Sequence, residues 1–330
     1  MNNFIGISII ICCHNSASKL PPTLTALSRQ KVIGKIACEI ILVDNNSSDD
    51  TGAVATNIWK KLGEPFSLMI VEEKIPGLSN ARSKGILASQ YEYLIFCDDD
   101  NWLFDDYLNT VYGLFDSKPE VALIGGVGHA ELDVKAPEWF QTLAGFGYAI
   151  GSDGRQTGYT DSAYGAGMAI RKEMLQALND GHISFILSDR VGKNLSSGGD
   201  SEMSVLVNAS GKKIWFDEGL KFGHKLPSWR INWSYYRRLR YAFGCANVFL
   251  ELYNEAFKIP GKKVALKDLI YYCIRYSHLI MLGYFFKKEK YAYAMQQLGK
   301  FATLYFDNDK LKEKLPIAIS NKRYLTAIAS

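Results

Sequence analysis

Apolar runs that alternate with helix-like segments dominate the first hundred residues and constrain the fold most. Four runs rich in Ile, Leu and Val have the continuous apolar pattern of strands buried on both faces; they lie at residues 7–13, 39–43, 67–71 and 93–97. Helices are predicted between them, beginning near residue 18 and covering residues 53–61 and 78–89. Because strands that alternate with helices form βαβ units, the sequence predicts an α/β fold with a mainly parallel central sheet flanked by helices.

Polar clusters follow three of these predicted strands. The first strand ends at His14-Asn15, the second at residues 44–46 and the fourth at residues 98–100. Open α/β sheets bind ligands outside the carboxyl ends of their strands. We therefore expect the three clusters to converge on one rim of the sheet and to form a ligand site there.

The acidic triplet Asp98-Asp99-Asp100 carries the most chemical information. Adjacent carboxylates repel one another unless a cation or water screens them. Mg²⁺ and Mn²⁺ take oxygen ligands, and a diphosphate commonly supplies some of them. Side chains two residues apart in an extended segment point the same way, so Asp98 and Asp100 could share a metal or a ribose. The alternative is a solvated acidic turn that caps the next helix.

Two further clusters fit a nucleotide but are less specific. Asp44 follows the second strand, where its carboxylate could accept hydrogen bonds from a nucleobase or ribose. The rest of that loop has the composition of a helix cap, with Ser48 or Asp49 as the expected capping residue. Arg82 lies on the helix before the acidic triplet and offers a planar fork for phosphate or base oxygens, although a single Arg on a helix is usually a surface residue.

Gly198-Gly199-Asp200 is the candidate for acid–base chemistry. The glycines allow the backbone to approach a ligand closely, and Asp200 could deprotonate an acceptor hydroxyl. The alternative is a glycine turn followed by an Asp helix cap. His224 lies beyond another predicted strand, at residues 213–217. A single His of this kind is more often structural than a ligand.

Taken in order, these motifs resemble the inverting glycosyltransferases of family 2, which have the GT-A fold. The resemblance covers roughly residues 5–228 and rests on the whole ordered set rather than on any one motif. The set consists of the Ile-rich strand with His14-Asn15, residues 43–51, Asn80-Ala81-Arg82, residues 96–100, Gly165-Ala166-Gly167-Met168, Gly199-Asp200-Ser201-Glu202 and His224.

The resemblance implies roles that local chemistry alone only permits. Asp44 would contact the nucleobase, Arg82 the base or diphosphate, and Asp200 would be the catalytic base. The predicted nucleotide-binding residues are His14, Asn15, Asp44, Asn46, Arg82, Asp98 and Asp99; the predicted sugar- or acceptor-binding residues are Gly165, Ala166, Gly167 and Trp229; the predicted metal ligands are Asp98, Asp100 and His224, holding Mn²⁺ or Mg²⁺.

The implied reaction is transfer of a sugar from a nucleoside diphosphate to a hydroxyl, in one displacement that inverts the anomeric carbon. UDP-sugars are the favoured donors and GDP-sugars come next. The expected acceptor is a carbohydrate or a lipid-linked molecule, in the synthesis of cell-surface polysaccharide or lipopolysaccharide.

The domain prediction divides the chain at residue 228. Residues 1–228 would form the catalytic domain, with a nucleotide-binding part up to about residue 100 and an acceptor part from 101 to 228. Residues 229–330, rich in Trp, Tyr and Arg, would form a helical C-terminal region. These helices are expected to pack on the catalytic domain; the alternative hypothesis is peripheral contact with a membrane. The apolar stretch 266–286 contains four ionisable residues, which argue against a membrane span.

Composition and charge narrow the class of protein further. The net charge of +4 is too small to indicate nucleic-acid binding. The six cysteines form no CxxC pair, which argues against a zinc site and favours free thiols in a reducing compartment. No secretory signal peptide is recognised, because the first apolar run lacks a basic leader. The predicted location is the cytoplasm, with the inner face of the membrane as the alternative.

Two other functions remain open from the sequence. A sugar-nucleotide nucleotidyltransferase would also use a parallel sheet and acidic metal ligands. Such enzymes usually have a glycine-rich basic loop after the first strand, whereas residues 14–19 contain no glycine. A non-catalytic nucleotide-sugar-binding protein is the other alternative, and the presence of Asp98, Asp100 and Asp200 together argues against it.

Overall fold

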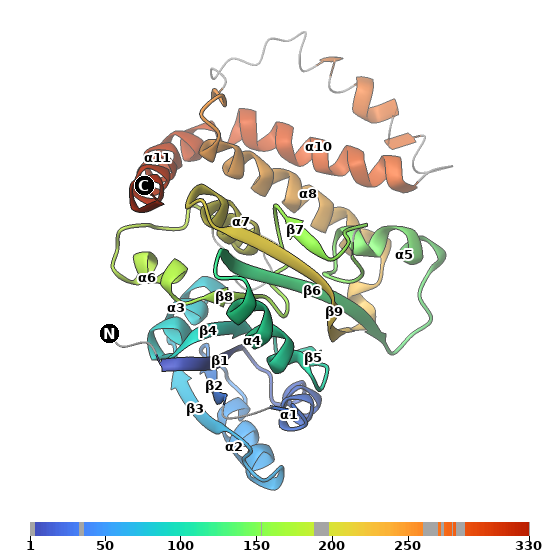
Figure 1. Ribbon diagram of the computed structural model, residues 1–330. Helices are drawn as coiled ribbons and strands as arrows, with labels where there is room; N and C mark the ends of the chain where they lie inside the picture. The colour runs from blue at the N-terminus through green and yellow to red at the C-terminus, as the bar shows by residue number, and fades with distance from the viewer. Residues whose placement is uncertain are drawn as a thin grey trace.

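The computed structural model describes residues 4–32, 36–152, 154–187, 198–259, 270–271, 274–278, 280–281 and 288–329. Its sheet contains nine strands, in the order β3-β2-β1-β4-β8-β6-β9-β5, with β7 paired to β9 (Figure 1). The strands are β1 (Phe4–Cys13), β2 (Ala37–Asp44), β3 (Ser67–Glu72), β4 (Tyr91–Phe96), β5 (Asn101–Leu103), β6 (Val121–Leu132), β7 (Gly158–Thr160), β8 (Ala169–Arg171) and β9 (Lys213–Leu226).

Helices cover both faces of the sheet, as predicted. Those up to residue 209 are α1 (Leu20–Ser28), α2 (Thr51–Lys61), α3 (Leu78–Ala88), α4 (Tyr107–Ser117), α5 (Glu138–Leu143), the 3₁₀ turn η1 (Ala144–Phe146), α6 (Glu173–Asn179) and α7 (Gly199–Ala209). After residue 227 follow η2 (Ser228–Arg230), α8 (Trp233–Leu250), η3 (Glu251–Tyr253), α10 (Lys288–Phe306) and α11 (Asn308–Ala329).

The four predicted N-terminal strands are confirmed, and they are parallel. Cys13 lies opposite Asp44 in the β1–β2 ladder, and Asp44 lies opposite Glu72 in the β2–β3 ladder. On the other side of β1, Ile10 lies opposite Phe96 of β4. This register brings the carboxyl ends of β1, β2 and β4 to the same edge, which is the convergence that the sequence predicts.

Beyond residue 100 the sheet is mixed, which differs from a purely parallel arrangement. The short strand β8 lies antiparallel between β4 and β6, and β5 and β7 are antiparallel to β9. The strand predicted at residues 213–217 is also much longer, because β9 continues to Leu226 through charged and glycine residues. Its far end pairs His224 with Asn101, the residue after the acidic triplet.

The core explains why the first strands are apolar without alternation. Side chains on one face of β1, such as Ile9 and Ile11, pack in a buried cluster with residues of α1, α2 and α4. Ile10 points to the other face and packs with residues of α3, α6 and α7. A strand covered on both faces needs apolar side chains at every position.

The C-terminal helices pack on one another and against the α/β part of the chain (Figure 1). α8 and α10 cross at two glycines, where added side-chain atoms would meet backbone: a Cβ on Gly244 would lie 1.9 Å from the carbonyl oxygen of Gln296, and one on Gly299 would lie 2.1 Å from that of Tyr241. The close crossing therefore depends on glycine at both positions.

Within the described residues, no helix is long and apolar enough to cross a bilayer. Most of the stretch 266–286 lies outside the described residues. The five cysteines that the structure describes are all free thiols, as predicted.

Replacing Gly244 by Ala should destabilise the protein by about 1–3 kcal/mol, because the new methyl group has no room at the α8–α10 crossing. The matched control is Gly113→Ala on the exposed side of α4, where a Cβ meets nothing within 4 Å. That change should be neutral or slightly stabilising, since Ala favours helix. Urea unfolding of both variants measures the difference, and equal stabilities would contradict the crossing.

Candidate active site

A cavity of about 1520 Å³ lies between the carboxyl ends of the first strands and the C-terminal helices. Its walls come from residues as far apart in the chain as Cys12 and Gln296. The structure brings ten of the predicted site residues to this one cavity: His14, Arg82, Asp98, Asp99, Asp100, Gly165, Ala166, Asp200, His224 and Trp229.

Four predicted residues are not among those that line the cavity: Asn15, Asp44, Asn46 and Gly167. The carboxylate of Asp44 accepts a hydrogen bond from the backbone N–H of Ser47, 3.1 Å away, and so shapes the turn after β2. The side chain of Asn15 likewise accepts from the N–H of Ser48 at 2.7 Å. These contacts hold the nucleotide-side loops together, and the proposed contact of Asp44 with a nucleobase stays a prediction.

Asn45, rather than its neighbours, faces the cavity from this loop. Its side chain accepts from the N–H of Gly77 at 2.8 Å and donates to the carbonyl oxygens of Glu73 and Ile75, at 3.0 and 2.7 Å. Its own carbonyl oxygen lies 2.9 Å from Nδ1 of His14. Asn45 thereby fixes the strand ends of β1 and β2 to the loop before α3. The sequence offered three polar residues here without indicating which one faces inward.

The acidic triplet is crowded, as its sequence suggests. Asp98 lies in the wall of the cavity, and its partial burial, together with the charge of Asp100, raises the pKa of Asp98 above its usual value. Arg82 and His224 act in the opposite direction and lower the same pKa, but less strongly. Asp99 turns toward the first loop, where the hydroxyl of Ser16 donates to it and Lys19 pairs with it at 3.0 Å.

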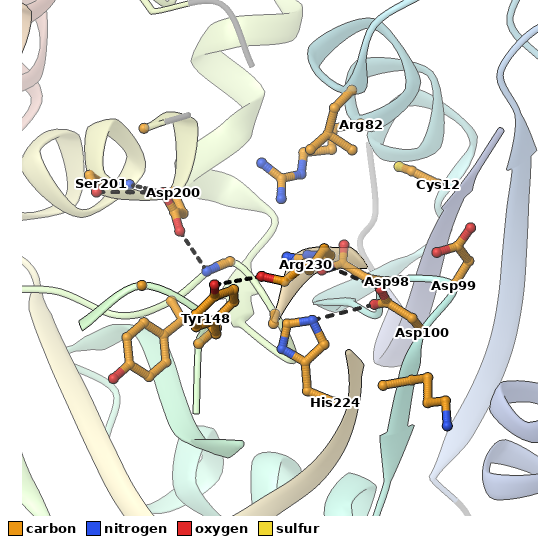
Figure 2. A pocket seen from close by; sticks show the side chains of 18 of the residues that line it. Cys12, Arg82, Asp98, Asp99, Asp100, Tyr148, Asp200, Ser201, His224 and Arg230 are labelled. Atoms are coloured by element: carbon orange, nitrogen blue, oxygen red, sulfur yellow. Dashed lines mark hydrogen bonds and ion pairs between the residues drawn. The ribbon is translucent and has the colours of Figure 1, made fainter. Parts of the chain in front are cut away.

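Asp100 is held from the other side of the cavity. Nε2 of His224 lies 3.7 Å from one oxygen of Asp100, and Nη1 of Arg230 lies 3.6 Å from the other (Figure 2). The ring of His224 reaches this position because β9 pairs with β5, directly after the triplet. Arg230 was not among the predicted site residues, because it is one of several arginines near Trp229 and only the fold places it beside Asp100.

Two carboxylates with one imidazole beside them have the donor chemistry of a site for Mg²⁺ or Mn²⁺. Burial is the main cause of the raised pKa of Asp98, and the charge of Asp100 adds to it; a bound cation would favour the ionised form. The described residues nevertheless contain no cluster of three or more His, Cys, Asp or Glu side chains that could hold a metal ion by themselves. A cation here would need further ligands besides these side chains, and its binding stays a prediction.

Asp200 lies across the cavity from this group, on the first turn of α7, with Arg82 above the space between them (Figure 2). One of its oxygens accepts from the N–H of Gly165 at 2.9 Å, and the other from the N–H of Ser201 at 2.8 Å. A Cβ on Gly165 would lie 3.0 Å from Nη2 of Arg82 and 3.1 Å from the Cβ of Asp200. Glycine at position 165 therefore allows the guanidinium of Arg82 and the side chain of Asp200 to lie against the same stretch of backbone.

An exposed tryptophan stands at the edge of the cavity. Trp229 is 64% exposed and meets Tyr235 edge to face, with 5.6 Å between ring centroids. The turn that carries it, η2, is held by Tyr148, whose hydroxyl donates to the carbonyl oxygen of Arg230 at 2.7 Å. Exposed aromatic faces beside a polar cavity suit the apolar face of a sugar ring.

Asp98→Asn should raise the Tm near neutral pH by about 2–4 °C. Because the folded-state pKa of Asp98 is raised, folding with an ionised carboxylate costs free energy once the pH exceeds the pKa of the unfolded chain. The gain should therefore shrink toward acidic pH, where the wild-type carboxyl is protonated in both states. Asp99→Asn is the control: it loses the partners Ser16 and Lys19 and should lower the Tm or leave it unchanged. A lower Tm for Asp98→Asn at neutral pH would contradict this account.

Comparison with known proteins agrees with this geometry. The family model described as glycosyl transferase family 2 matches residues 8–178. A cholesterol galactosyltransferase of Borreliella burgdorferi is 34% identical over 107 residues, which are 32% of this chain and 28% of that protein. The probable glycosyltransferase YdaM of Bacillus subtilis is 26% identical over 288 residues, 84% of this chain and 63% of that protein. The matched part thus spans less than a third of the galactosyltransferase and just under two thirds of YdaM.

Solved structures add the fold. The crystal structure of S. aureus TarS 1-349 in complex with UDP-GlcNAc has a TM-score of 0.53 and 14% identity, and the match covers 98% of this chain and 91% of that one. The family match covers more than half of the chain. It agrees with the sheet order and with the position of the acidic triplet at the end of β4. The chain belongs to glycosyl transferase family 2 and has the GT-A type of α/β fold.

Proposed function

We propose that this chain is a divalent-cation-dependent, inverting glycosyltransferase that moves a sugar from a UDP-sugar to an acceptor hydroxyl. The observation that carries the proposal is the placement of Asp200 opposite Asp98 and Asp100 in one cavity, with Arg82 and His224 between and beside them. A displacement in one step needs a base on one side of the reacting carbon and charge stabilisation on the other, and the cavity offers both.

The acidic side of the cavity would bind the diphosphate end of the donor. Asp98 and Asp100, with His224 beside them, would hold Mn²⁺ or Mg²⁺. Such a cation neutralises negative charge on a diphosphate leaving group. Arg82 is buried and lies 5.3 Å over the ring of Phe96, so its guanidinium is held in place before any ligand binds. We assign it to the diphosphate.

Asp200 would act as the base that takes the proton from the attacking hydroxyl. The N–H groups of Gly165 and Ser201 each hold one of its oxygens, which leaves each oxygen a lone pair for the hydroxyl. The carboxylate is therefore oriented, and its direction is set by two different backbone segments. Inversion at the anomeric carbon follows from a single in-line attack on the face opposite the diphosphate.

The nucleoside would lie at the ends of β1 and β2, beside His14 and Asn45. Asp44 remains the proposed contact for the base, and Asn15, Asn46 and Asp99 the supporting residues. UDP is the preferred nucleotide because the solved relative with the same fold is in complex with UDP-GlcNAc. The sugar would rest against Gly165 and Ala166.

The acceptor would enter on the side of Trp229. Relatives of this chain include the poly-beta-1,6-N-acetyl-D-glucosamine synthase of Staphylococcus epidermidis, 27% identical over 121 residues, 37% of this chain and 28% of that protein. We therefore place the reaction in the synthesis of a cell-surface polysaccharide or a related glycoconjugate, on the cytoplasmic side of the membrane. Contact of residues 229–330 with that membrane is part of the proposal.

UDP binding should require Mn²⁺ or Mg²⁺, and Asp98→Asn or Asp100→Asn should weaken it by about ten-fold or more. Titration calorimetry with UDP, GDP and UTP, with and without Mn²⁺, measures this. The matched control is Asp116→Asn, an exposed carboxylate on α4 away from the cavity, which should bind as the wild type does. Cation-independent diphosphate binding would contradict the proposal, and a preference for UTP would favour a nucleotidyltransferase.

Asp200→Asn should lower kcat by about 10²–10⁴ while the Kd for UDP changes little, because general-base catalysis contributes on that scale and the base does not hold the nucleotide. Release of UDP from UDP-sugars measures kcat. The exposed Asp161→Asn is the control and should retain wild-type activity. Full activity of Asp200→Asn would remove Asp200 from the mechanism.

A further inference from the structure

A buried carboxylate follows Asp200 by two residues. Glu202 is fully buried, yet its side chain leaves the first turn of α7 on a different side from Asp200, since two residues along a helix turn by about 200°. Asp200 therefore faces the cavity, while Glu202 faces the segment before α7 and the C-terminal helices. Glu202 belongs to the Gly199–Glu202 motif of the resemblance, but neither the resemblance nor the proposed chemistry gives it a role.

Glu202 joins three parts of the chain. One of its oxygens accepts from the N–H of Ile186 at 2.8 Å and from the hydroxyl of Tyr253 at 2.6 Å. Its other oxygen accepts from the N–H of Leu187 at 2.9 Å. The carboxylate thus ties the first turn of α7 both to residues 186–187 and to η3, the turn that ends α8.

Asn321 of α11 extends the connection. Its side chain pairs with both backbone groups of Ser184, accepting from the N–H at 3.0 Å and donating to the carbonyl oxygen at 2.7 Å. The same amide donates to the hydroxyl oxygen of Tyr253 at 3.0 Å. Asn321 and Tyr253 are 1% and 7% exposed. Residues 184–187 are consequently held by Glu202 from one side and by Asn321 from the other.

Tight packing restricts the motion of residues 184–187 relative to the first turn of α7. A Cβ on Gly198, the residue before α7, would lie 2.8 Å from Cδ1 of Leu187 and 3.2 Å from the Cβ of Ala246. Apolar side chains of α7, α8, η3 and α11 form one buried cluster around it. Burial and the carboxylate of Glu202 also raise the pKa of Tyr253, so its hydroxyl remains a donor at physiological pH. Buried, charge-assisted hydrogen bonds of this kind fix the orientation of the groups they join.

We propose that Glu202 is a positioning residue for Asp200, and that Tyr253 and Asn321 make the C-terminal helices part of the catalytic unit by holding Glu202 in place. This inference rests on the proposed role of Asp200 as the base. The first turn of α7 can rotate Asp200 toward or away from the acceptor, and the carboxylate two residues on fixes that rotation. Tyr253 and Asn321 then contribute to catalysis without touching substrate.

Hydrogen exchange followed by mass spectrometry tests the physical connection on the full-length chain. Tyr253→Phe keeps the ring and removes only the hydroxyl, so amides at residues 184–187 and 199–203 should exchange about ten-fold faster, as expected for one lost charge-assisted hydrogen bond. The matched control is Tyr324→Phe on α11, whose ring stacks on His182 and lies outside the network. Exchange in the first turn of α7 that stays equal to the control would overturn the proposal. Glu202→Gln is the second variant if Tyr253→Phe does not fold.

Kinetics separate positioning from mere stability. With UDP-glucose, UDP-galactose or UDP-N-acetylglucosamine as donor and water as acceptor, Tyr253→Phe should release UDP about ten-fold more slowly with an unchanged Kd for UDP. The same change in an Asp200→Asn background should cost nothing further, because the network acts through Asp200. A full additional loss in that background would overturn the proposal. Absence of UDP release by the wild type would instead contradict the proposed function, and the exchange experiment would still decide the network.

Discussion

Crowding of carboxylates at the end of β4 is the constraint around which the rest of the site is arranged. Burial and the neighbouring Asp100 raise the pKa of Asp98. Keeping this carboxyl ionised therefore costs free energy, which nearby groups such as Arg82 partly offset. Two arginines and one imidazole lie close to these carboxylates, and each comes from a different element: Arg82 from α3, His224 from β9 and Arg230 from η2. Such a concentration of like charge lowers the stability of the fold, and it is typical of sites that bind a ligand or a cation.

The sheet explains how distant segments reach this point. Parallel pairing of β1 with β2 and β4 places three strand ends on one edge of the sheet. The antiparallel strands that follow bring the end of β9 back to this edge. Because β9 runs past β6 to pair with β5, His224 arrives beside Asp100 although more than a hundred residues separate them. A single mixed sheet therefore joins the parallel N-terminal strands to the residues on the opposite side of the cavity.

The C-terminal helices are more than a cover for this sheet. α8 supplies part of the cavity wall. Behind the first turn of α7, Tyr253 donates to the carboxylate of Glu202, and Asn321 donates to the hydroxyl oxygen of Tyr253. The boundary predicted at residue 228 separates two kinds of secondary structure, but the hydrogen bonds cross it. A helix that carries a base can be oriented from its rear surface, where the contacts are dry and therefore strong.

The sequence by itself determined the parallel half of the fold and the acidic, glycine and Asp200 motifs, because strand burial and turn chemistry act over a few neighbouring residues. It did not determine which polar residue of a loop faces inward. Asn45 lines the cavity where Asp44 was expected, because the Asp44 carboxylate accepts from the N–H of Ser47, while the Asn45 amide bonds to the loop before α3. Arg230, Tyr148 and Glu202 likewise carry no local signal. Their positions depend on partners between about 50 and 130 residues away, and only the packing of β9, α8 and α11 brings those partners together.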